Sequence, residues 1–234
     1  MEKAEALLRW HHPTRGTICP SVFIPLAEEF GLIHELGDWV LNEAIGQVRN
    51  WRQSYNSRFQ VSVNVSPMQF NSDGQIHRWI DTVKAIDLDP GSILLEITEG
   101  LLLENDQNNI ELLSELRAVG IQIALDDFGT GYSSLSYLKV LEIDYLKIDR
   151  SFIKSLAVES GDLVVCQAIL SIAQNMGFDV VAEGVETLEQ EKLLLGIDCH
   201  YLQGFRYAKP IATGEFEKLF FDFAPGDSLI ERVA

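Results

Sequence analysis

The sequence has few cysteines and no long apolar run, and each shortage excludes a class of protein. Its three cysteines, Cys19, Cys166 and Cys199, are far apart and follow no zinc-site spacing. Scattered cysteines in an odd number favour reduced thiols in a cytoplasmic compartment. No signal peptide is visible, and no apolar stretch approaches the ~20 residues that a membrane-spanning helix needs. We therefore expect a cytoplasmic chain, either as a whole protein or as the cytoplasmic part of a larger, membrane-anchored one.

Positive charge is also scarce. The chain has 18 Lys and Arg residues against 35 Asp and Glu residues, which gives a formal net charge of −17. Proteins that bind duplex nucleic acid normally carry a basic patch, and none is visible here. The surplus of acid has an ordinary explanation in solubility and a more specific one, in which some carboxylates bind metal ions. Only the positions of the acids can separate the two.

Short apolar segments alternate with longer amphipathic segments along the 234 residues. This order predicts an α/β fold, with a parallel sheet and crossover helices. Seven strands indicate a TIM (β/α)8 barrel that lacks its first strand. We expect one domain over residues 1–223 and a tail over 224–234. The predicted strands are 4–9, 59–65, 93–98, 121–125, 145–148, 179–182 and 201–202, and the predicted helices are 23–29, 36–52, 76–85, 108–119, 163–176, 188–195 and 214–221.

Polar residues recur at the carboxyl ends of these predicted strands. In a TIM barrel this edge carries the catalytic residues. The pair Asp126-Asp127 follows one apolar run directly, and Lys147 lies between apolar neighbours in another. The remaining polar residues at or near strand ends are Glu5, Asn64, Glu96, Glu99, Asp149, Glu183, Glu186 and Gln203.

A ring of acids at one edge would repel itself unless cations neutralise it. Oxygen ligands favour Mg²⁺ or Mn²⁺ over Zn²⁺. Asp126 and Asp127 can face neighbouring ions, and one of them can bridge two metals about 3.5–4 Å apart, as in two-metal hydrolases. Taken singly, each has an ordinary alternative: Glu5 paired with a lysine, Asp126-Asp127 in a solvated turn, Lys147 paired with Asp149. Their recurrence across six strands favours the metal site.

Two further features suit phosphate chemistry. Arg9 is predicted to close the first strand, where its guanidinium could hold a phosphate at two points. Gly129 and Gly131 give the segment after Asp127 the freedom to close over the metals, although an ordinary glycine-rich turn has the same composition. His11 and His12 stand beside Pro13 and are expected in a loop outside the site.

In these blocks the chain resembles the EAL-domain phosphodiesterases, which cleave cyclic di-GMP. The blocks run in family order over about the first 210 residues, and their number makes a chance likeness untenable. They are EALLRW (5–10), FIPLAE (23–28), VNVS (63–66), EITE (96–99), DDFGTGYSSL (126–135), LKIDRSF (146–152), VAEGVET (181–187) and QGF (203–205).

The resemblance implies a modified TIM barrel with one antiparallel strand, and a role for each matching residue. Glu5, Asn64, Glu96 and Asp126 resemble the ligands of one metal, and Asp126 would bridge to a second metal held mainly by Asp127. Glu183 resembles a ligand through water or the general base, and Lys147 the group that orients the attacking water. Arg9 and Gln203 resemble residues on the substrate side. Glu99, Glu186 and Asp149 resemble residues that hold the loop 127–134 in its working shape.

The resemblance also implies a function: hydrolysis of cyclic di-GMP to linear pGpG in bacterial signalling, with two Mg²⁺ or Mn²⁺ ions and with Ca²⁺ as an inhibitor. It implies a homodimer and an upstream sensory or GGDEF-type domain. One departure is the family's upstream strand with a Tyr-Gln-Pro-like motif, which nothing here matches. Two other hypotheses are a silent receptor for the same nucleotide, and an aldolase that uses Lys147 as a Schiff base. The aldolase leaves the acids unexplained.

Overall fold

The computed structural model describes residues 2–72, 74–103, 107–130, 138 and 141–221. The chain forms two compact units, each with its own strands and helices. We call residues 2–124 with 134–143 the N-terminal unit, and residues 125–133 with the chain from 144 onward the C-terminal unit. The predicted tail 224–234 and the loop residue Gly131 lie outside the described residues.

The N-terminal unit contains parallel strands in the order β1 (Lys3–Ala6), β4 (Gln60–Val65) and β5 (Ile93–Thr98), followed by the first residues of β6 (Gln122–Phe128). Most residues of β4 and β5 are apolar and buried. Near-continuous burial is the pattern of parallel strands that are covered on both faces. This explains why β5, a run of five buried residues ahead of Thr98, has the bounds that the sequence predicts.

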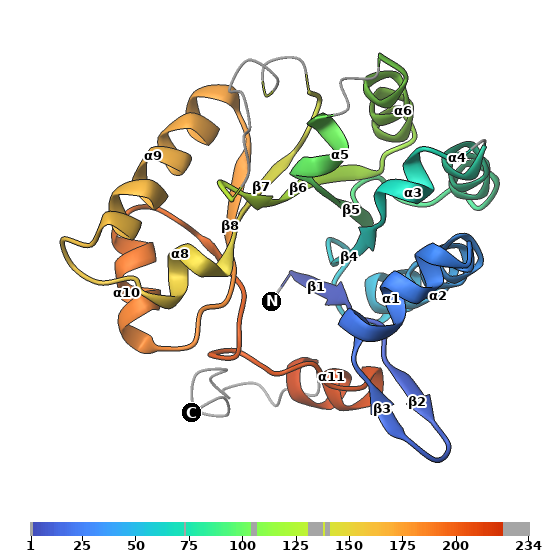
Figure 1. The fold of residues 1–234 in the computed structure, drawn as a ribbon, viewed down its shortest axis with the longest axis horizontal. Helices are drawn as coiled ribbons and strands as arrows, with labels where there is room; N and C mark the ends of the chain where they lie inside the picture. The colour runs from blue at the N-terminus through green and yellow to red at the C-terminus, as the bar shows by residue number, and fades with distance from the viewer. Residues whose placement is uncertain (1, 73, 104–106, 131–137, 139–140, 222–234) are drawn as a thin grey trace. The chain divides into compact units, whose positions relative to one another are not determined.

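Helices of the N-terminal unit bury one side each. In α2 (Ile33–Ser54) the buried residues Leu41, Ile45 and Val48 recur every three or four positions, which places them on one face. Figure 1 shows α1 and α2 side by side in blue. The other helices of this unit are α1 (Pro20–Glu29), α3 (Pro67–Phe70), α4 (Gln75–Ala85), α5 (Glu99–Leu103) and α6 (Gln107–Ala118).

A hairpin that the sequence did not predict follows β1. Strands β2 (Trp10–His12) and β3 (Gly16–Ile18) pair antiparallel, with His12 opposite Gly16. Nδ1 of His12 accepts hydrogen bonds from the N–H groups of Thr14 at 3.2 Å and Arg15 at 3.3 Å, and this closes the turn. The two histidines are therefore strand residues with a structural role, where a loop was expected.

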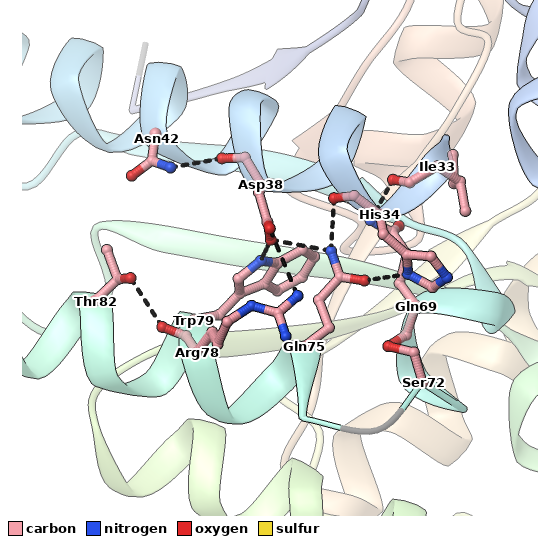
Figure 2. A network of polar contacts seen from close by, with 10 residues as sticks. All are labelled: Ile33, His34, Asp38, Asn42, Gln69, Ser72, Gln75, Arg78, Trp79 and Thr82. Atoms are coloured by element: carbon pink, nitrogen blue, oxygen red, sulfur yellow. Dashed lines mark hydrogen bonds and ion pairs between the residues drawn. The ribbon is translucent and has the colours of Figure 1, made fainter. Parts of the chain in front are cut away.

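A buried polar network joins α2, α3 and α4 (Figure 2). The Gln75 side chain hydrogen bonds to Nδ1 of His34 at 2.6 Å, and its Nε2 donates to Oδ1 of Asp38 at 3.0 Å. Nε1 of Trp79 donates to the same Asp38 oxygen at 2.6 Å. Nε2 of Gln69 donates to the Ile33 carbonyl at 3.1 Å. Because buried polar groups are costly when they lack partners, this network specifies how the three helices pack.

Replacing Gly37 with alanine is expected to destabilise the protein, against the usual trend. A helical Gly→Ala change normally stabilises by about 0.5–1 kcal/mol. A Cβ at Gly37 would collide with the amide of Gln69 and lie 3.3 Å from the Trp79 ring. Moving Gln69 breaks buried hydrogen bonds, so we expect a net loss of about 2 kcal/mol in the free energy of unfolding, measured by urea denaturation. Gly46, which has open space around its Cβ position, is the matched control, and Gly46→Ala should not destabilise.

The C-terminal unit contains the end of β6, then β7 (Tyr145–Ile148), β8 (Asp179–Ala182) and β9 (Tyr201–Leu202), in that order. Strand β7 pairs parallel with β8, and β8 pairs parallel with β9. Ser160 caps the first turn of α9, and Gly177 ends that helix with φ +80°, a conformation that favours glycine. The helices of this unit are α8 (Arg150–Lys154), α9 (Gly161–Met176), α10 (Leu188–Gly196) and α11 (Thr213–Phe220).

All seven predicted strands and all seven predicted helices have a counterpart, but one site residue is placed differently. Strand β1 ends at Ala6, so Arg9 does not close it. Arg9 lies in the link to β2, where its guanidinium donates to the Leu8 carbonyl at 2.8 Å. The chain leaves the sheet early because it must turn into the hairpin.

The three cysteines form no disulfide, as the sequence predicts. Burial raises the pKa of the Cys166 thiol to about 11 and that of Cys199 to about 12, so both remain protonated and unreactive at neutral pH. In the portion of the chain that the structure describes, every helix is too short or too polar to cross a bilayer.

Candidate active site

Three oxygen-bearing side chains share one face of the strands in the N-terminal unit. Glu5 lies in register beside Ser62, and Asn64 lies in register beside Glu96. Residues in register on parallel strands point to the same face, as do residues two apart on one strand. Nδ2 of Asn64 donates to Oε1 of Glu5 at 2.6 Å. This bond orients the amide and leaves its carbonyl oxygen as the atom suited to bind a cation.

These three residues differ in how deeply they are buried. Glu96 is only 3% exposed, Glu5 is half-buried, and Asn64 is exposed. A carboxylate as deeply buried as Glu96 is rarely tolerated without a cationic or hydrogen-bonded partner. The prediction that Glu5, Asn64 and Glu96 come together at strand ends is therefore consistent with the geometry of this unit.

Lys147 is the centre of the second group, in the C-terminal unit. Its side chain is 2% exposed, and its Nζ lies 2.5 Å from Oε1 of Glu183 and 3.3 Å from Oδ2 of Asp126. The two carboxylates are 19% and 13% exposed. The sequence offered Asp149 as the ordinary partner of Lys147, and the structure pairs it with the two predicted catalytic acids instead. Two acids from two other strands thus converge on the ammonium group of Lys147.

Asp127 and Asp149 form a second contact in the same unit. Burial, then the charges of Asp126 and Asp149, raise the pKa of Asp127. Burial alone would raise the pKa of Asp149, but hydrogen bonds from Ser151, the Arg150 N–H and Asp127 lower it. A hydrogen bond joins the two side chains, and it raises the pKa of Asp127 while it lowers that of Asp149.

The backbone holds Asp127 in an unusual conformation. Its φ is +55°, in the left-handed region, and its N–H donates to Oδ1 of Asp126 at 2.9 Å. The Asp127 carbonyl accepts from the Thr130 hydroxyl at 2.9 Å. Asp127 therefore departs from regular strand geometry directly after Asp126, near the end of β6.

Two loops that carry Glu183 and Gln203 are joined along their backbones. The Val185 N–H donates to the Gln203 carbonyl at 3.0 Å, and the Arg206 N–H donates to the Val185 carbonyl at 2.9 Å. A Cβ at Gly204 would collide with the Val185 backbone, so only glycine permits this approach. Half-buried Gln203 is thereby held beside the Glu183 loop, and its role in the site stays a prediction.

The predicted loop-stabilising residues differ in their surroundings. Asp149 caps α8 by accepting from the Ser151 N–H at 3.0 Å, in addition to its contact with Asp127. Glu99 begins α5 and is 5% exposed, and within the described residues neither of its carboxylate oxygens has a hydrogen-bond partner. Glu186 is exposed, and its N–H donates to Oε1 of Gln190 at 2.7 Å. The role that the sequence gives Glu99 and Glu186 concerns residues 131–134, which lie outside the described range.

The donor set fits a hard divalent cation. Its groups are carboxylates and one amide, the ligands that Mg²⁺ and Mn²⁺ prefer, with no thiolate or imidazole among them. Across the ranges that the structure describes, no three His, Cys, Asp or Glu side chains lie close enough together to hold a metal ion. In the C-terminal unit the Lys147 ammonium stands between Asp126 and Glu183, and in the N-terminal unit the group next to Glu5 is the Asn64 amide.

Parallel strands with helices between them, and acids, an amide and a lysine at the strand ends, define an α/β domain of the TIM-barrel class. Comparison with known proteins gives the family. The EAL domain model matches residues 1–210, and the chain belongs to the EAL-domain family.

Relatives and solved structures agree with this assignment. The chain is 42% identical over 207 residues to the bifunctional diguanylate cyclase/cyclic di-GMP phosphodiesterase MucR of Pseudomonas aeruginosa, covering 88% of this chain and 30% of that protein. It is 38% identical over 229 residues to the cyclic di-GMP phosphodiesterase NbdA of the same organism, covering 96% and 29%. The chain thus spans under a third of the length of these relatives.

The crystallised MucR phosphodiesterase, in complex with c-di-GMP, superposes with a TM-score of 0.87 at 41% identity, covering 92% of this chain and 87% of that one. This likeness confirms the predicted fold class, an α/β modified TIM barrel. It also confirms the resemblance on which the expected site rests, while the role of each residue stays a prediction.

Proposed function

We propose that this chain hydrolyses cyclic di-GMP to the linear dinucleotide pGpG with the help of divalent cations, Mg²⁺ or Mn²⁺. Membership of the EAL-domain family and the names of MucR and NbdA support the substrate and the reaction. The observation that carries the proposal is the burial of Lys147 against Asp126 and Glu183 at strand ends. A buried ammonium group held between two carboxylates at strand ends is the kind of charge cluster that is often found at active sites.

The reaction adds one water across one of the two phosphodiester bonds. The water oxygen bonds to phosphorus, the bond from phosphorus to a ribose oxygen breaks, and that oxygen leaves with a proton. A base must take a proton from the water. Glu183 is suited to this role because its carboxylate is held in place by Lys147 and is still partly accessible.

The remaining roles follow from the placement of the residues or, for Arg9, from the family resemblance alone. Lys147 supplies a fixed positive charge for the attacking water or the phosphate oxygens, in a site with little competing solvent. Arg9 binds phosphate, and Gln203 is held beside the catalytic loop by the contact with Val185. Glu5, Asn64, Glu96, Asp126 and Asp127 would hold the cations. When bound, such cations neutralise phosphate charge and lower the pKa of water enough to supply hydroxide.

The wider setting is also part of the proposal. Because the relatives are more than three times as long as the matched region, an upstream sensory or GGDEF-type domain would control this domain. A cytoplasmic location and a homodimer complete the proposal. The domain itself requires no duplex nucleic acid.

Turnover should depend on the cation supplied. We expect purified protein with Mn²⁺ or Mg²⁺ to convert cyclic di-GMP to pGpG, and excess EDTA to remove at least 99% of this activity. Ca²⁺ should bind without supporting turnover, because it accepts looser geometry and more ligands than Mg²⁺ does. Chromatography of the nucleotides measures each rate, and linear pGpG incubated in parallel reports any contaminating nuclease.

The same experiment separates the competing hypotheses. Nucleotide binding without product, at saturating Mn²⁺, would replace the enzyme by a silent receptor. Full activity in EDTA would remove the metal from the proposal. If the protein neither hydrolyses nor binds cyclic di-GMP, this nucleotide is excluded as its ligand.

A further inference from the structure

Ser66 stands two residues beyond Asn64, where β4 passes into α3, and several hydrogen bonds tie it to the structure. Its N–H donates to Oε1 of Gln69 at 2.9 Å, and its Oγ accepts from the Met68 N–H at 3.2 Å. The first of these bonds belongs to the capping box that Ser66 and Gln69 form at the start of α3. A further bond leaves this segment, because the Ser66 hydroxyl donates to Oε1 of Glu28 in α1 at 2.6 Å.

Gln69 anchors the other end of the short helix. It is 2% exposed, and its Nε2 donates to the Ile33 carbonyl at 3.1 Å, as Figure 2 shows. The backbone that follows β4 is therefore held from two directions, by Gln69 against α2 and by Glu28 from α1. Of the two, Glu28 is the half-buried one, so it can be changed without opening the core.

Asn64 depends on this support. Its side chain is exposed, and its amide contact with Glu5 constrains the side chain but not the backbone that carries it. Only Val65, which is 5% exposed, separates Asn64 from Ser66. A displacement of Ser66 is therefore passed to Asn64 through one residue that cannot yield easily.

We propose that Glu28 is a positioning residue for Asn64, acting through the Ser66 hydroxyl. The Glu28 side-chain oxygen accepts a short hydrogen bond from the Ser66 hydroxyl, and an amide oxygen in the same place could accept it as well. The bond thereby fixes the end of β4, and with it the direction in which the Asn64 carbonyl oxygen faces. This role rests on the proposed function, in which that oxygen binds a cation.

The alternative is that the bond merely docks α1 and has no bearing on Asn64. Stability measurements alone would not separate the two roles, because both predict some loss. A readout at Asn64 itself is needed, together with a variant of Glu28 that keeps a hydrogen-bond acceptor. Glu28→Gln is such a variant, since its amide oxygen can still accept from the Ser66 hydroxyl while the charge is gone.

The first measurement uses metal-free protein. The side-chain NH₂ signals of Asn64 in a ¹⁵N–¹H spectrum are assigned by their loss in Asn64→Asp. In Glu28→Ala these signals should shift or broaden, and in Glu28→Gln they should stay close to wild type. Glu29→Ala changes the adjacent glutamate, which is exposed, and it should leave these signals unmoved. If Glu28→Ala does not fold, Glu28→Asp, which shortens the reach by one methylene, replaces it.

The second measurement is the affinity for Mn²⁺ in the absence of nucleotide. It is obtained by calorimetry, or from the electron paramagnetic resonance signal of the free ion. Loss of an outer partner of a metal ligand typically weakens metal affinity 10–100-fold. Because Glu28 acts through the backbone, we expect about a 10-fold weaker affinity in Glu28→Ala. We expect less than about a 2-fold change in Glu28→Gln and none in Glu29→Ala.

Unchanged Asn64 signals and unchanged Mn²⁺ affinity in a folded Glu28→Ala variant would overturn the proposal and leave Glu28 with α1 docking alone. Shifted Asn64 signals in a protein that neither binds Mn²⁺ nor hydrolyses the nucleotide would keep the positioning role and sink the proposed function. Equal effects of Glu28→Gln and Glu28→Ala would show that charge, and not the hydrogen bond, matters, and would also overturn it.

Discussion

Replacing Lys147 with methionine is expected to lower the free energy of unfolding by about 3 kcal/mol in metal-free buffer. Methionine keeps most of the length and volume of the side chain but removes its ammonium group. Asp126 and Glu183, which are 13% and 19% exposed, would then face each other with no positive charge between them. An uncompensated pair of carboxylates in a poorly solvated place is far more costly than the loss of one exposed ion pair.

Urea denaturation in EDTA measures this loss, and the same measurement in Mn²⁺ provides a second test. A divalent cation neutralises the same acids, so added Mn²⁺ should reduce the difference in the free energy of unfolding between the variant and the wild type. Lys154→Met, at the exposed end of α8, is the matched control and should change stability by less than about 0.5 kcal/mol. Equal stability of Lys147→Met and wild type in EDTA would show that Lys147 does not balance the two acids.

Replacing Asp126 with asparagine should reduce turnover of cyclic di-GMP by about 10³-fold or more while leaving the fold intact. The size follows from losing one electrostatic contact in a preorganised site, which commonly costs 10²–10³-fold, together with a ligand of the cations. The amide keeps an oxygen for the Asp127 N–H, so the local turn survives. It carries no charge, and a neutral oxygen binds Mg²⁺ more weakly than a carboxylate does.

Initial rates of pGpG formation at saturating Mn²⁺ test this expectation, with circular dichroism to verify the fold. Asp179→Asn is the matched control, because Asp179 is exposed at the opposite, amino end of β8 and should tolerate the change. A variant of Asp126 that retains a tenth of the wild-type rate would remove this residue from the catalytic group.

The strands could be predicted well because strands that are buried on both faces are nearly continuous apolar runs in the sequence. Strand β5 at Ile93–Thr98 agrees residue for residue, since its five buried residues, four of them apolar, lie between Gly91 and the helix start at Glu99. Helix α1 begins at Pro20, three residues before the predicted start. Proline is common at the first position of a helix, but a search for hydrophobic periodicity does not detect that signal.

The shortest helices were not predicted because they are too short to show a hydrophobic repeat. Helices α3 and α8 have four and five residues, too few for a 3.6-residue repeat to emerge. Their signal lies in their caps: Ser66 with Gln69 for α3, and Asp149 with Ser151 for α8. The hairpin after β1 had a similar local signal in Pro13 and Gly16, but its two histidines read as a loop.

The site was predicted to the extent that the topology of a parallel sheet determines it. Carboxyl ends of neighbouring strands must meet, so Lys147 and Glu183, and likewise Asn64 and Glu5, could be brought together from their positions alone. Contacts that depend on helix packing could not be found this way. Ser66 and Glu28 are 38 residues apart, and nothing in either segment indicates the other.

The left-handed backbone at Asp127 restricts what evolution can do with this position. Asparagine is among the few residues that adopt such a conformation readily, whereas β-branched side chains are disfavoured there. One exchange of oxygen for nitrogen would therefore preserve the turn and discard the charge. Under the proposed function, one conservative substitution at Asp127 would therefore separate an enzyme from a folded domain that only binds the nucleotide.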